Sequence, residues 1–250
     1  MKVFPHHKLN LGLNVVLRRP DGYHDIETLF VPCDAYSDEL EIVEAPSFSA
    51  DLGDCDWPIE KDLAVRAYLI LKDEFDLPPV RLNMRKGIPY GAGLGGGSSD
   101  AAAVLKLCNS LFSLGLTDAQ LASRARTLGA DCPFFIYNRP LFATGIGDEF
   151  KEFALDLSGF RFEVVMPEGV HIGTAEAYSA LQPHRADPPL EEALRHPVPE
   201  WKGCVFNDFE LPAFRKYPLL AEIKKDFYDR GALYSAMSGS GAAIFGMFAK

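Results

Sequence analysis

The stretch PYGAGLGGGSSDAAA (residues 89–103) places five glycines within the seven residues from Gly91 to Gly97, and two serines and an aspartate follow. Glycine loses more backbone freedom on folding than any other residue, so such a cluster is costly in an ordered segment. Glycines just before a helix expose successive backbone N–H groups. These add to the unpaired N–H groups of the first helical turn, at the positive end of the helix dipole. The stretch therefore predicts a loop that binds a phosphate chain.

Two better-known phosphate loops fit this stretch poorly. No lysine lies between Gly87 and Lys106, so the G-x-x-x-x-G-K-[ST] motif is absent. Residues 91–96 do match G-x-G-x-x-G, but the strand before them is half polar. The acid expected to close a second strand would be Asp118, which lies at an expected helix start instead. A dinucleotide site and a glycine loop that packs without any ligand remain as alternatives.

The composition of the chain is that of a globular protein. It has 250 residues, of which 48% are hydrophobic and 24% charged, enough for one large or two ordinary domains. The formal net charge of −10 argues against a nucleic-acid or membrane partner, because both need a basic surface. The five cysteines are widely spaced and form no C-x-x-C pair, and the N-terminus resembles no signal peptide. We expect a cytoplasmic protein without disulfides or zinc.

Strand and helix patterns alternate along the chain, which predicts a mixed α+β fold. In residues 8–17 the apolar residues share one face and Lys8 and Asn10 the other, so the polar pair is expected to face away from the core. The character of the sequence changes from about residue 150, which suggests a boundary near residue 148, between domains 1–148 and 149–250. Further strands are expected at 26–31, 38–45, 80–85 and 160–167. Helices are expected at 61–75, 117–129 and 218–231, and a further helix is expected to follow Ser98 and Ser99 and to end at about Gly115.

Several of these segments together resemble the GHMP kinases, the superfamily of galactokinase, homoserine kinase and mevalonate kinase. The glycine stretch resembles the phosphate-binding motif of that family. The other matching segments occur in the expected order: KLNLGLNVVLRRPDGYHDIETLF (8–30), LGADCPFFI (128–136), NDFE (207–210) and SGSGAAIF (238–245). The first of them is similar to the branch of the family that acts on 4-diphosphocytidyl-2-C-methyl-D-erythritol, in non-mevalonate isoprenoid precursor biosynthesis.

The resemblance implies a fold and a reaction. The fold would have an N-terminal domain like domain 2 of ribosomal protein S5 and a ferredoxin-like C-terminal domain, with the active site in the cleft between them. Relatives continue through another helix and strand, so the C-terminal domain is expected to lack these two elements. The implied reaction transfers the γ-phosphoryl group of ATP, with Mg²⁺, to the 2-hydroxyl of this small-molecule substrate. The implied assembly is a monomer or a homodimer.

The resemblance also carries site residues onto this chain, although it assigns no metal ligand. Asp131 falls on the base that accepts the proton of the alcohol, and Lys8 on the cation that holds this carboxylate and the γ-phosphate. The acceptor side would comprise Asn10, Tyr23, His24, Thr174 and Tyr178, with Gly239 and Gly241 from the third motif. The ATP side would comprise Pro89, Gly91, Ala92, Gly93, Leu94, Gly95, Gly96, Gly97, Ser98, Ser99 and Asp62.

Each assignment has a purely structural alternative. Asp131 could cap the helix that follows it, and Lys8 could be a solvated strand lysine. Asp62 stands where relatives commonly carry asparagine, which puts the affinity for the nucleotide in doubt. For the whole chain, the alternatives are a homoserine- or mevalonate-type kinase, a dinucleotide-dependent oxidoreductase, and a nucleotide-binding module without catalysis.

Overall fold

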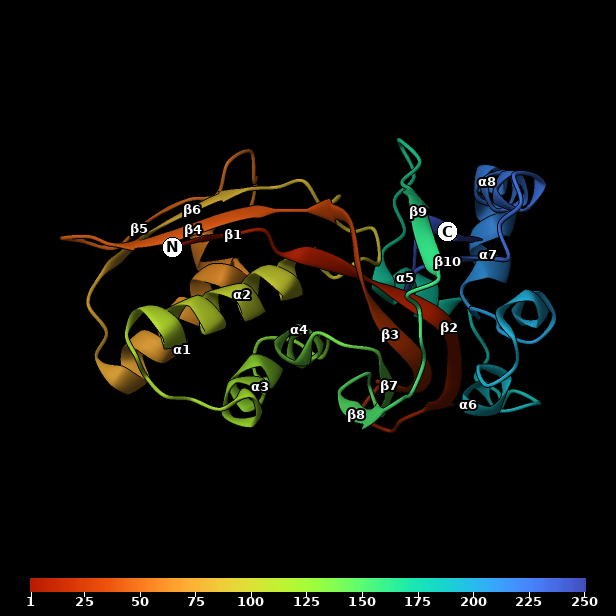
Figure 1. Ribbon diagram of the computed structural model, residues 1–250, viewed down its shortest axis with the longest axis horizontal. Helices are drawn as coiled ribbons and strands as arrows, with labels where there is room; N and C mark the ends of the chain where they lie inside the picture. The colour runs from red at the N-terminus through yellow and green to blue at the C-terminus, as the bar shows by residue number, and fades with distance from the viewer. The chain divides into compact units, whose positions relative to one another are not determined.

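The computed structural model describes residues 1–250, in which strands and helices alternate as expected (Figure 1). The strands are β1 (Lys2–Val3), β2 (His6–Arg18), β3 (His24–Ser37), β4 (Glu39–Glu44), β5 (Ser49–Asp51), β6 (Val80–Arg85), β7 (Leu141–Thr144), β8 (Glu149–Glu152), β9 (Phe160–Val165), β10 (Tyr234–Met237) and β11 (Ile244–Ala249). The helices are η1 (Ile59–Lys61), α1 (Leu63–Phe75), α2 (Gly96–Leu111), α3 (Asp118–Arg126), α4 (Cys132–Tyr137), α5 (Thr174–Ser179), α6 (Leu190–Ala193), η2 (Val198–Gly203), α7 (Glu210–Lys216) and α8 (Pro218–Asp229), η1 and η2 being 3₁₀ helices.

The chain forms two compact units that are interleaved in sequence. The first unit comprises Met1–His7, Tyr36–Tyr90 and Gly95–Arg139, and the second comprises Lys8–Ala35, Gly91–Leu94 and Pro140–Lys250. The chain therefore passes from one unit to the other inside β2, inside β3 and on both sides of Gly91–Leu94. The boundary near residue 148, which divides the chain by sequence order, stays a prediction.

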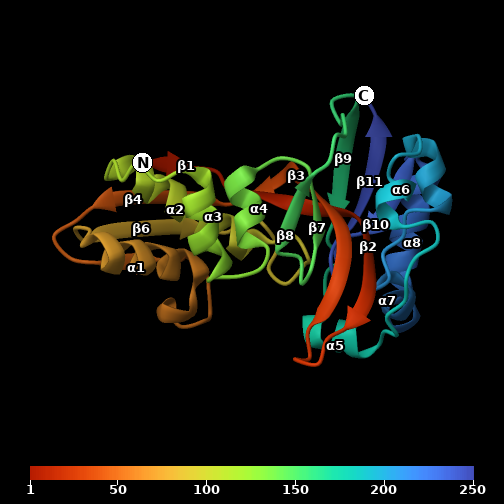
Figure 2. The same ribbon diagram turned by 90° about the horizontal axis from the view of Figure 1, so that it is seen from below.

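The first unit is a four-stranded sheet in the order β1-β4-β6-β5. Strands β4 and β6 are antiparallel, whereas β5 runs parallel to β6. The helices α1 and α2 lie together on one face of this sheet (Figures 1 and 2). In β6, Val80, Leu82 and Met84 are buried while Arg81 and Arg85 are exposed, so one face of the strand packs on the helices and the other meets solvent.

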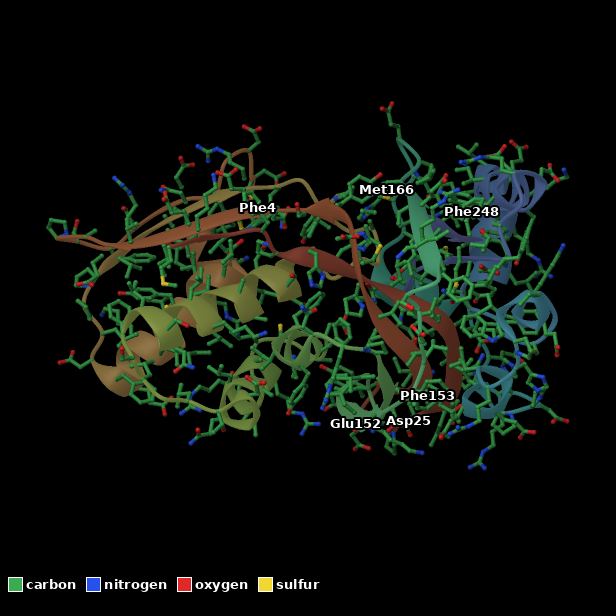
Figure 3. All side chains as sticks on the ribbon, viewed as in Figure 1. Phe4, Asp25, Glu152, Phe153, Met166 and Phe248 are labelled. Atoms are coloured by element: carbon green, nitrogen blue, oxygen red, sulfur yellow. The ribbon has the colours of Figure 1, made fainter.

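The second unit contains two sheets, in the orders β2-β3-β7-β8 and β10-β11-β9. Helix α8 packs on the second sheet, which carries Phe248 (Figure 3). The rings of Phe227 and Phe248 meet edge to face with centroids 6.1 Å apart. A Cβ on Gly246 would lie 2.5 Å from Cδ1 of Phe227, so only glycine lets the helix approach this closely. The core of the unit joins this sheet and helix to β2, β3, α5 and α7.

Most of the expected elements are confirmed, because local signals define them. The predicted capping box is present. The Thr117 side chain accepts a hydrogen bond from the backbone N–H of Gln120, and the Gln120 side chain accepts one from the backbone N–H of Thr117. The helix after the glycine run ends at Leu111, earlier than expected, because Ser113 already adopts the left-handed conformation at φ +53°. None of the helices has both the length and the apolar character that crossing a membrane requires.

The prediction for the polar face of β2 is wrong in one respect. Lys8 and Asn10 do share a face of the strand, but their side chains are 3% and 1% exposed. Alternation along a strand shows which residues share a face, whereas the elements that cover that face come from distant parts of the chain. Both faces of β2 are buried here, so its polar side chains need hydrogen-bond partners inside the protein.

Candidate active site

The glycine stretch makes an uncapped helix start. Gly91, Gly93 and Gly95 have φ angles of +67°, +75° and +75°, which side chains rarely allow. Helix α2 begins at Gly96, and its N-cap Gly95 supplies no side chain to accept from the first-turn N–H groups. A Cβ on Gly96 would lie 3.0 Å from Ile88, whereas one on Gly97 would make an ordinary contact. The positive end of this 16-residue helix is therefore available to an anion.

Part of the glycine content serves packing between two backbone segments of the second unit. A Cβ on Gly93 would lie 2.2 Å from the carbonyl oxygen of Ser238, and one on Gly239 would lie 3.0 Å from that of Gly93. Ala243 also donates its N–H to the carbonyl of Ala92 at 3.2 Å. A Cβ on Gly241, where φ is +97°, would lie 2.7 Å from a methionine sulfur. The structure thus brings the glycine stretch and the SGSGAAIF segment (residues 238–245, the third glycine-rich segment, named after the third family motif) together, main chain against main chain.

The two serines of the stretch differ in their surroundings. Ser99 is 4% exposed, and its hydroxyl donates to the carbonyl of His6 at 2.6 Å. Ser98 is half-buried and hydrogen-bonds the thiol of Cys132, whose pKa burial raises to about 11. The Ser99 hydroxyl therefore ties α2 to the start of β2. Contact of either serine with ATP stays a prediction, as it does for Pro89 and the glycines.

Lys8 lies in β2 directly beside the glycine stretch. Its backbone N–H donates to the carbonyl of Leu94 at 3.0 Å, and its Nζ donates to Oδ1 of Asn10 at 2.5 Å. The ammonium also lies 4.8 Å from the centroid of the Phe30 ring. The alternative of a solvated strand lysine is wrong, because the side chain is buried. A buried ammonium next to a loop that is expected to bind phosphate suits a group that neutralises phosphate charge.

Asp131, in the first unit, precedes α4. It occupies the N-cap position with helical dihedral angles (φ −78°, ψ −18°), and its side chain accepts no capping hydrogen bond from the helix. The alternative that Asp131 serves as a helix cap is therefore not supported by its contacts. The side chain is half-buried rather than enclosed, which suits a carboxylate that meets a substrate.

Asp62 has a full set of hydrogen bonds within the first unit. It caps α1 by accepting from the N–H groups of Ala64 and Val65 at 2.8 and 3.3 Å, and it accepts from Nε1 of Trp57 at 3.0 Å. The Trp57 ring stacks on Tyr90 with centroids 4.9 Å apart, and Tyr90 is 73% exposed. A contact of Asp62 with ATP stays a prediction. The aromatic pair was not predicted, although an exposed tyrosine next to the glycine run is a sequence signal for base stacking.

A buried ion triad supports the segment that enters the glycine stretch. Asp38 accepts from the N–H groups of Gly87 and Ile88 at 2.6 and 2.8 Å, and from Lys86. Lys86 also donates to Oδ2 of Asp100 at 2.6 Å. Burial, opposed by Lys86 and reinforced by Asp38, raises the pKa of Asp100 to about 7. The triad joins this segment to α2, and sequence reasoning missed it because its members lie far apart along the chain.

On the expected acceptor side, the structure brings His24 and Tyr178 together. Their rings stack with centroids 4.7 Å apart, and Tyr178 meets Phe209 edge to face at 4.9 Å. Thr174 is the exposed first residue of α5, and Tyr23 is 61% exposed after the turn between β2 and β3. Aromatic rings of this kind offer faces on which a nucleobase can stack.

The NDFE segment anchors the third glycine-rich segment. Nδ2 of Asn207 donates to the carbonyls of Met237 and Gly239 at 2.7 and 2.9 Å, and its Oδ1 accepts from the N–H of Phe209 at 2.9 Å. Glu210 accepts from the N–H of Met237 at 2.8 Å. The motif was noted in the sequence without a role, and its role in the structure is to hold the turn that packs on Gly93.

Comparison with known families accounts for this combination of features. Residues 62–139 match the GHMP kinases N terminal domain, and residues 190–250 match the GHMP kinases C terminal domain. The chain therefore belongs to the GHMP kinase family, and the expected two-domain mixed fold is confirmed. It is an ATP-dependent small-molecule kinase by class, so the dinucleotide-dependent oxidoreductase alternative is wrong.

Relatives of high sequence identity narrow the family further. The chain is 49% identical to the 4-diphosphocytidyl-2-C-methyl-D-erythritol kinase of Bacteroides fragilis and 47% identical to that of Parabacteroides distasonis, over 99% and 100% of this chain and 92% of each relative. A crystal structure of 4-(cytidine 5'-diphospho)-2C-methyl-D-erythritol kinase superposes with a TM-score of 0.80 at 36% identity, covering 98% of this chain and 89% of the other. The chain thus groups with the 4-diphosphocytidyl-2-C-methyl-D-erythritol kinases. Mevalonate kinase of Methanococcus jannaschii, at a TM-score of 0.69 and 14% identity over 99% of this chain and 90% of the other, shares the fold alone.

Proposed function

We propose that this chain phosphorylates the 2-hydroxyl of 4-diphosphocytidyl-2-C-methyl-D-erythritol with ATP and Mg²⁺, a step of non-mevalonate isoprenoid precursor biosynthesis. The observation that carries the proposal is the buried ammonium of Lys8, whose own backbone N–H is hydrogen-bonded to the glycine stretch at Leu94. That position sets a cation beside the segment expected to hold the phosphates.

The donor side of the proposed site is the glycine stretch. The uncapped first turn of α2 offers backbone N–H groups to the phosphates of ATP, and Trp57 with Tyr90 offers aromatic surface to its base. No group of three or more His, Cys, Asp or Glu side chains could hold a metal without other ligands. This fits Mg²⁺, which kinase sites bind through one or two carboxylates together with substrate phosphates. Its charge would neutralise the phosphates during transfer.

The chemical step needs alignment, charge neutralisation and removal of one proton. We assign the proton to the carboxylate of Asp131 and the stabilisation of phosphate charge to Lys8. A positioned base typically contributes about 10²–10⁴-fold to the rate.

The acceptor side is the aromatic surface formed by His24 and Tyr178, with exposed Tyr23 next to it in sequence. Stacking of a base on an aromatic face is worth about 1–3 kcal/mol. We assign the cytosine to this surface, and Thr174 at the start of α5 to a polar contact with the substrate. An acceptor that carries cytidine is thereby favoured over homoserine or mevalonate, which have no base.

A coupled assay with ATP, Mg²⁺ and each of the three alcohols tests the proposal. We expect ADP to be released with the cytidine compound only. Asp131→Asn should lower kcat by about 10²–10⁴-fold or more, whereas Asp73→Asn, at an exposed position of α1, should leave it unchanged. Binding of ATP without transfer to any alcohol would instead identify a catalytically silent module, and near-normal turnover of Asp131→Asn would refute the assignment of the base.

A further inference from the structure

Lys8 is one end of a chain of buried hydrogen bonds inside the second unit. Its Nζ donates to Oδ1 of Asn10 at 2.5 Å, and Nδ2 of Asn10 donates to Oγ1 of Thr28 at 2.9 Å. The Thr28 hydroxyl in turn donates to the carbonyl of Gly12 at 2.6 Å. Lys8, Asn10 and Thr28 are 3%, 1% and 0% exposed, so the side chains of this network are shielded from water.

A second branch reaches Asn10 from the third glycine-rich segment. Oγ of Ser238 lies 3.3 Å from Oδ1 of Asn10 and 3.2 Å from the carbonyl oxygen of Gly93. A hydroxyl has a single proton to donate, so Ser238 links the asparagine and the glycine stretch through one shared donor. Ser238 is 0% exposed, and its own carbonyl is the atom that excludes a side chain at Gly93.

The direction of these bonds sets the orientation of the Asn10 amide. The proton of Thr28 is committed to the carbonyl of Gly12, so its oxygen can only accept from Asn10. Asn10 must therefore present its NH₂ group to Thr28 and its oxygen to the ammonium of Lys8. The opposite orientation would place two donors against each other, and buried donors without acceptors are costly.

We propose that Thr28 and Ser238 are positioning residues that, through Asn10, hold the Lys8 ammonium where the transferred phosphoryl group needs it. This inference rests on the proposed function. It gives Asn10 a task besides substrate binding, because both ends of its amide already have intramolecular partners. The hydrogen bond to the Asn10 oxygen orients the Lys8 ammonium, and the hydroxyls of Thr28 and Ser238 fix the position of that oxygen. Misplacement of a reacting group by about 1 Å can lower a rate by about 10²-fold.

The test compares Thr28→Val, which keeps the shape of the side chain and removes the hydroxyl, with Thr28→Ser, which keeps the hydroxyl. We expect Thr28→Val and Ser238→Ala to lower kcat by about 10–100-fold. The KM values for ATP and for the alcohol should stay within about threefold, because ground-state contacts are retained. Thr28→Ser should recover most of kcat, and Thr127→Val, which removes an exposed hydroxyl, should match the unchanged protein.

Two controls separate positioning from loss of folding and from failure of the proposed function. Rates are normalised to the concentration of folded protein, and Thr28→Val is repeated in a Lys8→Met background, where it should cause no further loss. A kcat per folded molecule that Thr28→Val leaves unchanged, or that Thr28→Ser fails to restore, would overturn the positioning role alone. A wild-type protein that transfers no phosphate would overturn the proposed function, and the positioning role with it.

Discussion

Replacement of Asn207 gives the sharpest test of how the third glycine-rich segment is held. The side chain is 3% exposed and makes three hydrogen bonds, as a donor to two carbonyls and as an acceptor from the N–H of Phe209. A buried hydrogen bond contributes about 1 kcal/mol, and more where a partner is left unsatisfied. Asn207→Ala should therefore lower the free energy of unfolding by about 3 kcal/mol or more.

Asn207→Asp tests the direction of these bonds rather than their number. The aspartate keeps the size of the side chain and the acceptor for Phe209, but it turns two donors into acceptors that face the carbonyls of Met237 and Gly239. Burial next to carbonyl oxygens would raise the pKa of the new carboxyl above its ordinary value of about 3.9. The folded state then holds a proton that the unfolded state releases. The free energy of unfolding should therefore fall with rising pH, by up to about 1.4 kcal/mol per pH unit.

Urea unfolding of both variants at pH 5 and pH 8 measures these quantities. Asn83→Asp is the matched control, because Asn83 is only partly buried and bonds to Glu41 on the outer face of the first sheet. We expect that control to lose about 1 kcal/mol or less, as is usual for partly exposed sites. An Asn207→Asp variant that stays within about 1 kcal/mol of the unchanged protein at pH 8, or that has the same deficit at both pH values, would refute the buried donor role of Asn207.

Three further predictions concern the glycine stretch and its supports. Gly93→Ala should abolish ATP binding and lower stability far more than Gly22→Ala, because a Cβ at Gly93 would lie 2.2 Å from a backbone oxygen, whereas Gly22, also at positive φ, has nothing within 4 Å; equal losses of melting temperature would contradict this. The pKa of Asp100 is raised to about 7, so the folded state keeps a proton that the unfolded state releases between about pH 4 and 7, and the free energy of unfolding falls across that window. Asp100→Asn should flatten this decline in urea titrations, and an unaltered slope would refute the interpretation. Asp62→Ala should cost about 1 kcal/mol or more through the lost cap of α1, while Asp62→Asn keeps an acceptor and most of that stability; identical thermal midpoints for the two variants would count against the cap.

Local signals in the sequence predicted much of the fold. Alternation along 80–85 identified β6 and its buried face, the Thr117–Gln120 spacing identified the start of α3, and helical periodicity identified α1 and α8. These signals work because a strand or a helix turn is stabilised by residues within a few positions of one another. The short helices at 190–193 and 198–203 were missed, since they carry too few residues to show a period.

The candidate site also has features that local sequence signals predict and features that they do not. Glycines before a helix, followed by serines, predict a phosphate loop from neighbouring residues alone, and the resemblance to the GHMP kinases added Lys8 and Asp131 as candidates. No local pattern could reveal the burial of Lys8 or the hydrogen bonds that Thr28 and Ser238 make. Asn10 and Ser238 are 228 residues apart in the chain, yet their side chains hydrogen-bond.

By itself, therefore, the sequence determined most of the longer elements and the family, because both depend on short-range spacing or on motifs. Only the tertiary structure decided which polar side chains are buried together and which donor faces which acceptor. The reason is physical. A hydrogen bond between distant segments depends on where the whole chain brings its main-chain and side-chain groups, and burial then makes every unpaired group costly enough to enforce one arrangement.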